Sequence, residues 1–314
     1  MKCLSIHLTD LCNSECTFCV VASPFYTKDT VDYEDVISFL ESHRGQGYDV
    51  VNLHGGEPTI HPRFLETLQT IRELGYPQIH LQTNGIRLAK REFTEKLVDL
   101  NVTKFIVSLH GDTPEYHDSQ TFTKGGLKKT LQGMRHVHSL GVHIRTNTVI
   151  THQNLERLPQ ISRLACEVGV SHVNYSNLHP VGSARLSRSR QMATFEEIRR
   201  YLYPAVDLVV GEGRTVTLEG FPHCTIGGGR ERLHLCNEYR DIKMLVRGDV
   251  LEHYDTFMKE QMAVFGPPCQ GCPWKEDCTG VYPEYIEYNG WSEFGASLAS
   301  SRDRGGKEGL AVGS

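Results

Sequence analysis

The sequence predicts an α/β fold: a partial (β/α)6 barrel of the TIM type, followed by a small cysteine-rich domain. Two observations lead to this prediction. Up to about residue 220, short apolar segments alternate with longer segments whose apolar residues recur at helical spacing, which is typical of parallel strands joined by helices. After residue 221, Gly, Pro and Cys interrupt short segments, which indicates a small domain held together by metal.

The predicted strands and helices follow one another in regular order. The strands are expected at residues 3–8, 50–53, 78–82, 104–109, 143–150, 172–176 and 215–218. The helices are expected at residues 33–40, 62–74, 92–100, 126–140, 155–168 and 195–210. Thr194, ahead of Glu196 and Glu197, marks the start of the last helix. In such folds, functional residues lie at the carboxyl ends of the strands.

The change in composition also sets the expected domain boundaries. Residues 1–220 form the barrel and residues 221–292 form the smaller domain. Residues 293–314 are rich in Ser, Gly and charged residues, with little to bury, and are expected to be a disordered tail.

Composition and charge narrow the classes of partner. The chain has 314 residues and a formal net charge of −5, which argues against a nucleic-acid-binding surface. No apolar run approaches the roughly 20 residues that a membrane span needs. We therefore expect a cytoplasmic protein with neither a nucleic-acid nor a membrane partner. Ten cysteines in such a protein indicate metal ligation rather than disulfides, although Cys3 and Cys166 stand apart as small buried residues.

Three cysteines follow the first predicted strand in a C-x3-C-x2-C arrangement: Cys12, Cys16 and Cys19. Thiolates suit iron–sulfur clusters or zinc. A structural zinc site would normally have a fourth Cys or His nearby, and none follows before His43. Three thiolates on a four-iron cluster would instead leave one iron open to a small molecule. A zinc knuckle or a chance grouping of cysteines is the alternative.

This stretch resembles the signature of the radical S-adenosylmethionine (SAM) superfamily, both in its spacing and in the aromatic Phe18 before the last cysteine. The resemblance implies a [4Fe–4S] cluster that binds SAM and a 5′-deoxyadenosyl radical that abstracts hydrogen from a substrate. Gly55, Gly56 and Glu57, which follow the second strand, resemble the GGEP motif of this family. Glycines let a backbone approach a ligand closely, and Glu57 could accept hydrogen bonds from the SAM ammonium group.

The resemblance also implies SAM contacts at later strand ends. Thr83 and Asn84 end the third strand and could face the cofactor. Ser108 and Arg145 fit the pair that holds the SAM carboxylate, and Asn147 lies on the same strand as Arg145. The remaining candidates are expected to contact ribose or adenine, or simply to cap loops: Asn174, Ser176 and Asn177. His54 and His110 fall at strand ends and could face a substrate.

A second set of cysteines lies near the end of the chain. Cys269, Cys272 and Cys278 form C-x2-C-x5-C, which resembles the twitch and SPASM extensions that hold auxiliary clusters in radical SAM enzymes. The sequence departs from the SPASM pattern, because Tyr282 and His253 occupy two cysteine positions. The resemblance therefore implies one auxiliary [4Fe–4S] cluster, with a structural zinc site as the alternative. Its fourth ligand is expected to be Cys224 rather than Cys236, with His253 as a third option.

The cysteine without a cluster suggests the reaction. If Cys224 binds iron, Cys236 can donate a hydrogen atom to a substrate radical, as an epimerase would require. This combination resembles aminoglycoside epimerases of the neomycin type, which implies antibiotic biosynthesis, a cationic sugar substrate and a flavodoxin-type electron donor. Three alternatives stay open: modification of a ribosomally made peptide, auxiliary-cluster-dependent dehydrogenation of an aminocyclitol, and a non-enzymatic iron–sulfur module.

Overall fold

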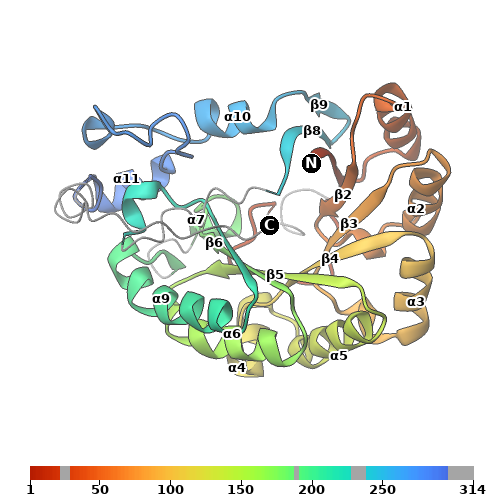
Figure 1. The fold of residues 1–314 in the computed structure, drawn as a ribbon, viewed down its shortest axis with the longest axis horizontal. Helices are drawn as coiled ribbons and strands as arrows, with labels where there is room; N and C mark the ends of the chain where they lie inside the picture. Colours follow the sequence, from red (N-terminus) through yellow and green to blue (C-terminus); the bar gives the residue numbers. More distant parts are fainter. Residues whose placement is uncertain (22–28, 187–190, 228–237, 296–314) are drawn as a thin grey trace.

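One mostly parallel sheet forms the centre of the protein (Figure 1). The structure is a computed structural model, and it describes residues 1–21, 29–186, 191–227 and 238–295. The strands lie in the order β7-β6-β5-β4-β3-β2-β1-β8-β9. Their bounds are β1 (Lys2–Thr9), β2 (Val50–Gly55), β3 (Gln78–Thr83), β4 (Val102–Ser108), β5 (His143–Ile150), β6 (His172–Asn177), β7 (Thr215–Glu219), β8 (Arg240–Val246) and β9 (Asp249–Leu251). The prediction of an α/β fold with a partial barrel is confirmed.

Strands β1 to β8 run parallel to their neighbours, whereas β9 runs antiparallel to β8. Within the described residues, the edge strands β7 and β9 do not pair with each other, so the barrel is open on one side (Figure 1). The seven predicted strands correspond to β1–β7, with ends that shift by one or two residues. The sequence analysis missed β8 and β9.

Helices cover the outer face of the sheet (Figure 1). The predicted ones are α1 (Tyr33–His43), α2 (Phe64–Glu73), α3 (Arg91–Asp99), α5 (Gly126–Ser139), α6 (Leu158–Glu167) and α9 (Phe195–Gly211). Helix α9 begins as predicted, because Thr194 and Glu197 form a capping box. Four further helices were not predicted: α4 (Pro114–Thr121), α7 (Ser183–Leu186), α10 (Tyr254–Gln261) and α11 (Pro283–Asn289). No helix of the described residues is long and apolar enough to cross a membrane.

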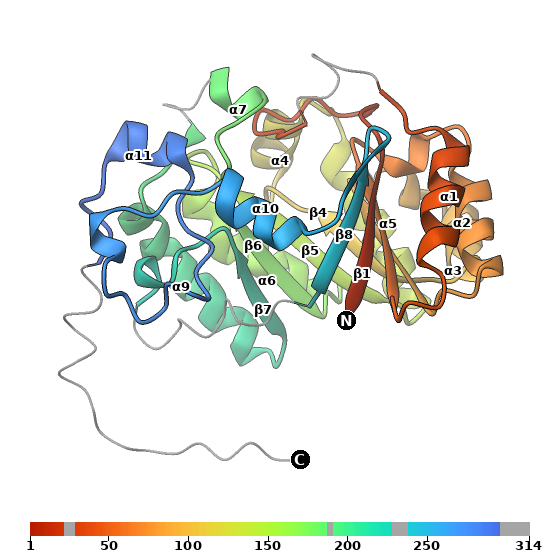
Figure 2. The same ribbon diagram turned by 90° about the horizontal axis from the view of Figure 1, so that it is seen from above.

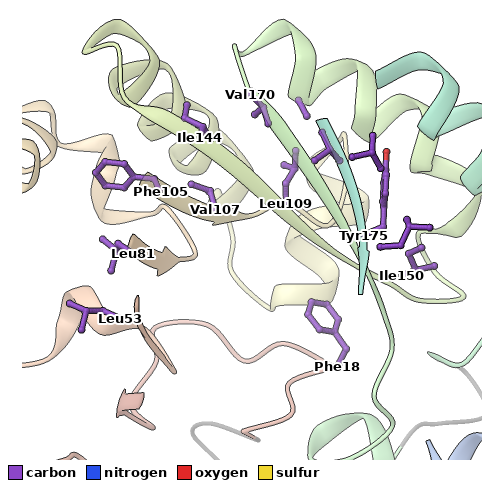
Figure 3. Close-up of a cluster of buried hydrophobic side chains, with 14 of the residues drawn as sticks. Phe18, Leu53, Leu81, Phe105, Val107, Leu109, Ile144, Ile150, Val170 and Tyr175 are labelled. Carbon is purple, nitrogen blue, oxygen red and sulfur yellow. The ribbon is translucent and has the colours of Figure 1, made fainter. Parts of the chain in front are cut away.

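The two faces of the sheet differ in polarity. Side chains alternate along each strand, and the parallel register places matching positions side by side. The outer face carries fully buried apolar residues such as Leu53, Leu81 and Phe105 (Figure 3). The inner face carries the alternate, mostly polar positions: His7, His54, His80, Gln82, Lys104, Ser108, Arg145, Asn147, His172, Asn174, Ser176, Thr217 and Glu219. The outer, apolar face of the sheet therefore packs against the helices, and the inner, polar face lines the barrel interior.

The C-terminal part of the chain crosses the open side of the barrel (Figures 1 and 2). It begins within the sheet, because β8 pairs with β1, and continues through α10 and α11. At the far side, Glu293 accepts hydrogen bonds from the backbone N–H groups of Phe195 (3.3 Å) and Glu196 (2.8 Å) at the start of α9. The boundaries expected at residues 220 and 292 stay predictions. Most of the expected tail, residues 296–314, lies outside the described residues.

Candidate active site

The loop with the first three cysteines lies over the carboxyl ends of the strands, directly after β1 (Figure 2). Helix α4 holds this loop from the side. The backbone N–H of Glu15 bonds to the carbonyl of Thr121 (3.0 Å), and that of Thr17 bonds to the carbonyl of Gln120 (2.9 Å). Phe18 is buried, and its ring lies edge-on to the His110 ring with the centroids 4.5 Å apart. The cysteine loop is thus held to α4 by two backbone hydrogen bonds and to His110 by the buried ring of Phe18.

All three thiols line one cavity of about 240 Å³. Eight of the residues predicted for the site contribute to it, together with His54 and His110: Cys12, Cys16, Cys19, Gly55, Gly56, Thr83, Asn84 and Ser108. Gln82, His117 and Thr130 also line it and were not predicted. Residues from the ends of three strands, β2, β3 and β4, and from the cysteine loop therefore meet at one place.

The thiols of Cys12 and Cys16 are poor acids in this setting. Burial, reinforced by neighbouring charged groups, raises the pKa of Cys12 to about 12 and that of Cys16 well above its ordinary value. A bound metal supplies the positive charge that removes such protons. Nearby, His54 Nε2 is buried without a hydrogen-bond partner among the described residues, and burial lowers the pKa of its ring to about 3. The donor set and the cavity fit a three-thiolate iron–sulfur cluster with a ligand beside it.

Gly55 and Gly56 are required by the cysteine loop itself. A Cβ on Gly55 would lie 2.4 Å from the Thr9 carbonyl oxygen, and one on Gly56 would lie 2.3 Å from that of Leu11. The backbone N–H of Gly56 bonds to the Thr9 carbonyl (2.6 Å). The close approach expected at these glycines is therefore made by the chain's own backbone, which crosses directly over them.

Glu57 anchors the site from beneath. Its side chain is fully buried and faces four donors: the backbone N–H (3.1 Å) and hydroxyl (2.5 Å) of Thr59, the hydroxyl of Thr83 (2.8 Å) and the backbone N–H of Asn84 (2.7 Å). Burial raises the pKa of Glu57, while these hydrogen bonds act in the opposite direction. Because its acceptors are occupied, Glu57 positions the strand ends, and its contact with a SAM ammonium group stays a prediction.

Asn84 links the third strand to the cysteine loop. Its side-chain Nδ2 donates to Asn13 Oδ1 (2.6 Å), and its Oδ1 accepts from the backbone N–H of Ile86 (3.0 Å). Asn84 and Thr83 thus connect Glu57, the end of β3 and the loop.

Three predicted cofactor contacts lie elsewhere on the inner face. Arg145 does not line the thiol cavity; its Nη1 lies 3.6 Å from Glu238 Oε2, near the amino end of β5. Lys104 pairs with the same carboxylate. Asn147 and Ser176 also lie outside that cavity, with the Ser176 hydroxyl 2.8 Å from Asn147 Oδ1. Their proposed roles in binding SAM stay predictions.

The second cysteine set gathers at another cavity. Cys224, Cys269, Cys272 and Cys278 line it, together with apolar residues such as Phe265 and Phe294. Burial, reinforced by the other three thiols, raises the pKa of Cys224 to about 11. His253 precedes α10 and does not line this cavity, and Cys236 lies outside the described residues. Among the described residues, no three His, Cys, Asp or Glu side chains converge on a point where one metal ion could be held.

Comparisons with known proteins agree on the class of fold. The family model described as the radical SAM superfamily matches residues 6–165, just over half of the chain. Curated relatives named "Probable GTP 3′,8-cyclase" are 28% identical over 204 residues in Saccharolobus islandicus and over 184 residues in Sulfurisphaera tokodaii. These matches cover 63% and 57% of this chain, and the chain spans only 64% and 56% of the relatives' own length.

Two solved structures share the fold over most of the chain. Streptococcus suis SuiB bound to S-adenosylmethionine has a TM-score of 0.68 and 16% identity, covering 91% of this chain and 74% of that one. The anSMEcpe enzyme with bound AdoMet has a TM-score of 0.64 and 14% identity, covering 97% of this chain and 95% of that one. At these identities the likeness extends to the fold alone.

Proposed function

Because the chain belongs to the radical SAM superfamily and is a radical SAM enzyme, we propose that it epimerises a carbon of a small cationic sugar, with one auxiliary [4Fe–4S] cluster. When bound and supplied with one electron, the first cluster and SAM would provide a 5′-deoxyadenosyl radical that can abstract a hydrogen atom from the substrate. Cys12, Cys16 and Cys19 would hold this cluster, and Gly55, Gly56, Asn84 and Ser108 would surround SAM in the shared cavity. Glu57 orients these groups through its buried hydrogen bonds.

The first test concerns radical formation. Replacing Cys12, Cys16 or Cys19 with Ala should abolish the release of 5′-deoxyadenosine by reduced, iron-reconstituted protein. The matched control is Cys166→Ala, because Cys166 lies on α6 away from both cysteine sets. Release of 5′-deoxyadenosine by the Cys12→Ala variant at the wild-type rate would contradict this assignment.

The auxiliary cluster is supported by the four cysteines that line the second cavity, Cys224, Cys269, Cys272 and Cys278. Thiolates in such numbers are typical ligands of iron–sulfur clusters. Reconstituted wild-type protein should contain about eight irons per chain, and a Cys269→Ala/Cys272→Ala variant about four, as clusters of four irons require. About four irons together with one zinc in the wild type would favour the structural zinc site instead.

The observation that supports epimerisation is this set of four cysteines, because a cluster bound by all four would need no thiolate from Cys236. Cys236 could then return a hydrogen atom to the face opposite the one attacked, and the thiyl radical left on Cys236 would be restored to a thiol by one electron from the flavodoxin-type donor and one proton from water. A Cys236→Ala variant should still form 5′-deoxyadenosine but give little epimer. In deuterated water, the wild-type product should carry one solvent deuterium at the inverted carbon, and a product without deuterium would reject the thiol donor.

Peptide modification is the second candidate. Its support is the likeness over most of the chain to SuiB, which was also solved bound to precursor peptide SuiA, and to anSMEcpe, solved with the Cp18Cys peptide. Dehydrogenation of an aminocyclitol is the third, and it would pass the substrate electron to the auxiliary cluster without a thiol. A product two hydrogens lighter than its substrate would identify dehydrogenation, whereas an epimer keeps the substrate mass.

The remaining parts of the proposal concern the cellular setting. We propose a flavodoxin-type reductase as electron donor and a cytoplasmic location. Nucleic acids and membranes are not proposed as partners, since the chain is modestly acidic.

A further inference from the structure

A chain of hydrogen bonds crosses the inner face of the sheet from β5 to β7 and ends at Glu219. His172 Nε2 lies 2.8 Å from the Thr217 hydroxyl, which donates to Asn174 Oδ1 over 2.5 Å. This fixes the orientation of the Asn174 amide. Its Nδ2 consequently points the other way and donates to Asn147 Oδ1 (2.7 Å) and Glu219 Oε2 (3.1 Å).

This network contains more acceptors than hydrogens. Ser176 Oγ lies 2.8 Å from Asn147 Oδ1 and 3.1 Å from Glu219 Oε2, yet a hydroxyl carries one hydrogen. Asn174 Nδ2 adds two hydrogens and also lies 3.1 Å from Ser176 Oγ, so three hydrogens serve five contacts. Glu219 Oε1 accepts no hydrogen bond from the described residues. The network is buried at Asn174, which is 1% exposed, and ends in an exposed carboxylate.

Glu219 shares its face of the sheet with the thiol cavity. It pairs with Ser176 in register, while Asn147 pairs with Ser108, which lines that cavity. The network therefore reaches the carboxyl ends of the strands at Ser176 and Glu219, on the polar inner face that also carries His54 and Gln82. A molecule bound there would be on the same side of the sheet as the radical source.

Two tyrosines of the C-terminal segment, Tyr254 and Tyr282, lie close enough to Glu219 for its charge to act on them. Burial and the Glu219 carboxylate raise the pKa of both Tyr254 and Tyr282. The Tyr282 hydroxyl lies next to Gly220, where a Cβ would come within 2.9 Å of it. The Tyr282 ring stacks on His179 with the centroids 4.0 Å apart. Aromatic faces beside a carboxylate are favourable for cations.

We infer that Glu219 binds an ammonium group carried by a small polyhydroxylated ring, which is the substrate class of the function proposed above. An ammonium offers three donors and no acceptor, so it matches the acceptor surplus of Glu219 and Asn147. An anionic group at this position would be repelled by the carboxylate. Tyr282, which stands where the SPASM pattern has a cysteine, forms part of the wall of this site.

The test compares two probes of the same ring size on the SAM-loaded, iron-reconstituted enzyme by calorimetry. 2-Deoxystreptamine carries two amines, and myo-inositol carries hydroxyls in their place. Wild-type protein should bind the diamine more tightly than myo-inositol. Glu219→Gln should lower the affinity for the diamine by about 10-fold or more, as expected for the loss of a charge-assisted hydrogen bond. The affinity for myo-inositol should change little. Glu219→Asp should recover part of the preference. The matched control is Glu212→Gln, on the exposed end of α9.

Two results would overturn the inference. One is the lack of any preference for the diamine in the wild-type protein, whether it binds both probes equally or binds neither at millimolar concentration. The other is an undiminished diamine affinity in a Glu219→Gln variant that has wild-type iron content and thermal midpoint. The readout is binding and not turnover, so the reaction is judged separately. Diamine binding that depends on Glu219, without an epimeric product, would sustain this inference and contradict the proposed epimerisation.

Discussion

Glu57 shows how a single buried carboxylate organises the strand ends around the thiol cavity. Its oxygens accept from two backbone N–H groups and two hydroxyls, and its side chain is fully buried. A Glu57→Gln substitution keeps the size of the side chain but turns an NH2 group toward these donors. Each buried donor left unsatisfied costs about 1–3 kcal/mol.

We therefore expect Glu57→Gln to lower the free energy of unfolding by at least that amount and to weaken SAM binding. Denaturant unfolding and a SAM titration measure both effects. Glu66→Gln is the control, since Glu66 forms an exposed pair with Arg63 and should change stability by less than about 1 kcal/mol. Equal stability of the two variants would show that Glu57 does not have this anchoring role.

Gly56 tests the contact between the second strand and the cysteine loop. In Gly56→Ala, the new Cβ would meet the carbonyl oxygens of Leu11 (2.3 Å) and Asp10 (2.7 Å), which are backbone atoms that cannot rotate away. The loop must then move, and we expect the iron content to fall by about half, because one of two four-iron clusters is lost. Gly211→Ala is the control, since nothing lies within 4 Å of a Cβ there. A normal iron content in Gly56→Ala would contradict this interpretation.

The sequence analysis grouped these residues from their motifs but could not distinguish their partners. The spacing of Cys12, Cys16 and Cys19 and the position of Gly55 and Gly56 after a strand were sufficient to predict that they meet. Whether a glycine accommodates a ligand or a neighbouring backbone depends on the path of the loop, and that path is set by long-range bonds such as Glu15 to Thr121. Arg145 illustrates the same limit, since its contact with Glu238 spans more than ninety positions of the chain.

At the scale of elements, the sequence analysis missed helices and strands that lack an apolar buried face. Helix α4 buries His117, Gln120 and Thr121, so it lacks the apolar periodicity that indicates a helix. Strand β8 is half-exposed along most of its length and follows a cysteine-rich stretch. Both elements matter for the site, because α4 holds the cysteine loop and β8 extends the sheet beyond β1.

The C-terminal segment is attached to the barrel through the start of α9. The Glu293 carboxylate accepts from the backbone N–H groups of Phe195 and Glu196 and from the Tyr285 hydroxyl. A negative charge at a helix N-terminus that also caps free N–H groups is worth about 1–2 kcal/mol. We expect Glu293→Gln to lose about this much stability and to speed hydrogen exchange at the amides of Phe195 and Glu196.

Glu260→Gln, on the exposed side of α10, is the matched control and should change neither measurement. Unchanged exchange at both amides in Glu293→Gln would mean that other contacts, such as the packing of Tyr285 on Phe195, hold the segment in place.

At the scale of the whole molecule, the sheet encloses a polar interior rather than an apolar core. Toward the amino ends of the strands, the inner face carries His80, Lys104, Arg145 and His172. The Glu238 carboxylate pairs with Lys104 and Arg145. The alternation of polar and apolar residues in β4 and β5 already contains this arrangement, but only the register between strands shows that the polar positions share one face. Buried basic residues of this kind make stability depend on pH.

Burial and the nearby cations lower the pKa of His80 and of His172 to about 3, whereas an unfolded histidine has a pKa of about 6.5. Below pH 6.5 these histidines bind protons in the unfolded chain but stay neutral in the folded protein. Stability present at neutral pH is therefore lost as the pH falls. Each such histidine should lower the free energy of unfolding by about 1 kcal/mol as the pH falls from 6.5 to 5.5. The thermal midpoint of the wild type should therefore fall steeply across this interval. The thermal midpoint of the His172→Gln variant should fall less steeply. The exposed control, His152→Gln, should follow the wild type. Parallel curves for wild type and His172→Gln would show that His172 is protonated as readily in the folded protein as in the unfolded chain.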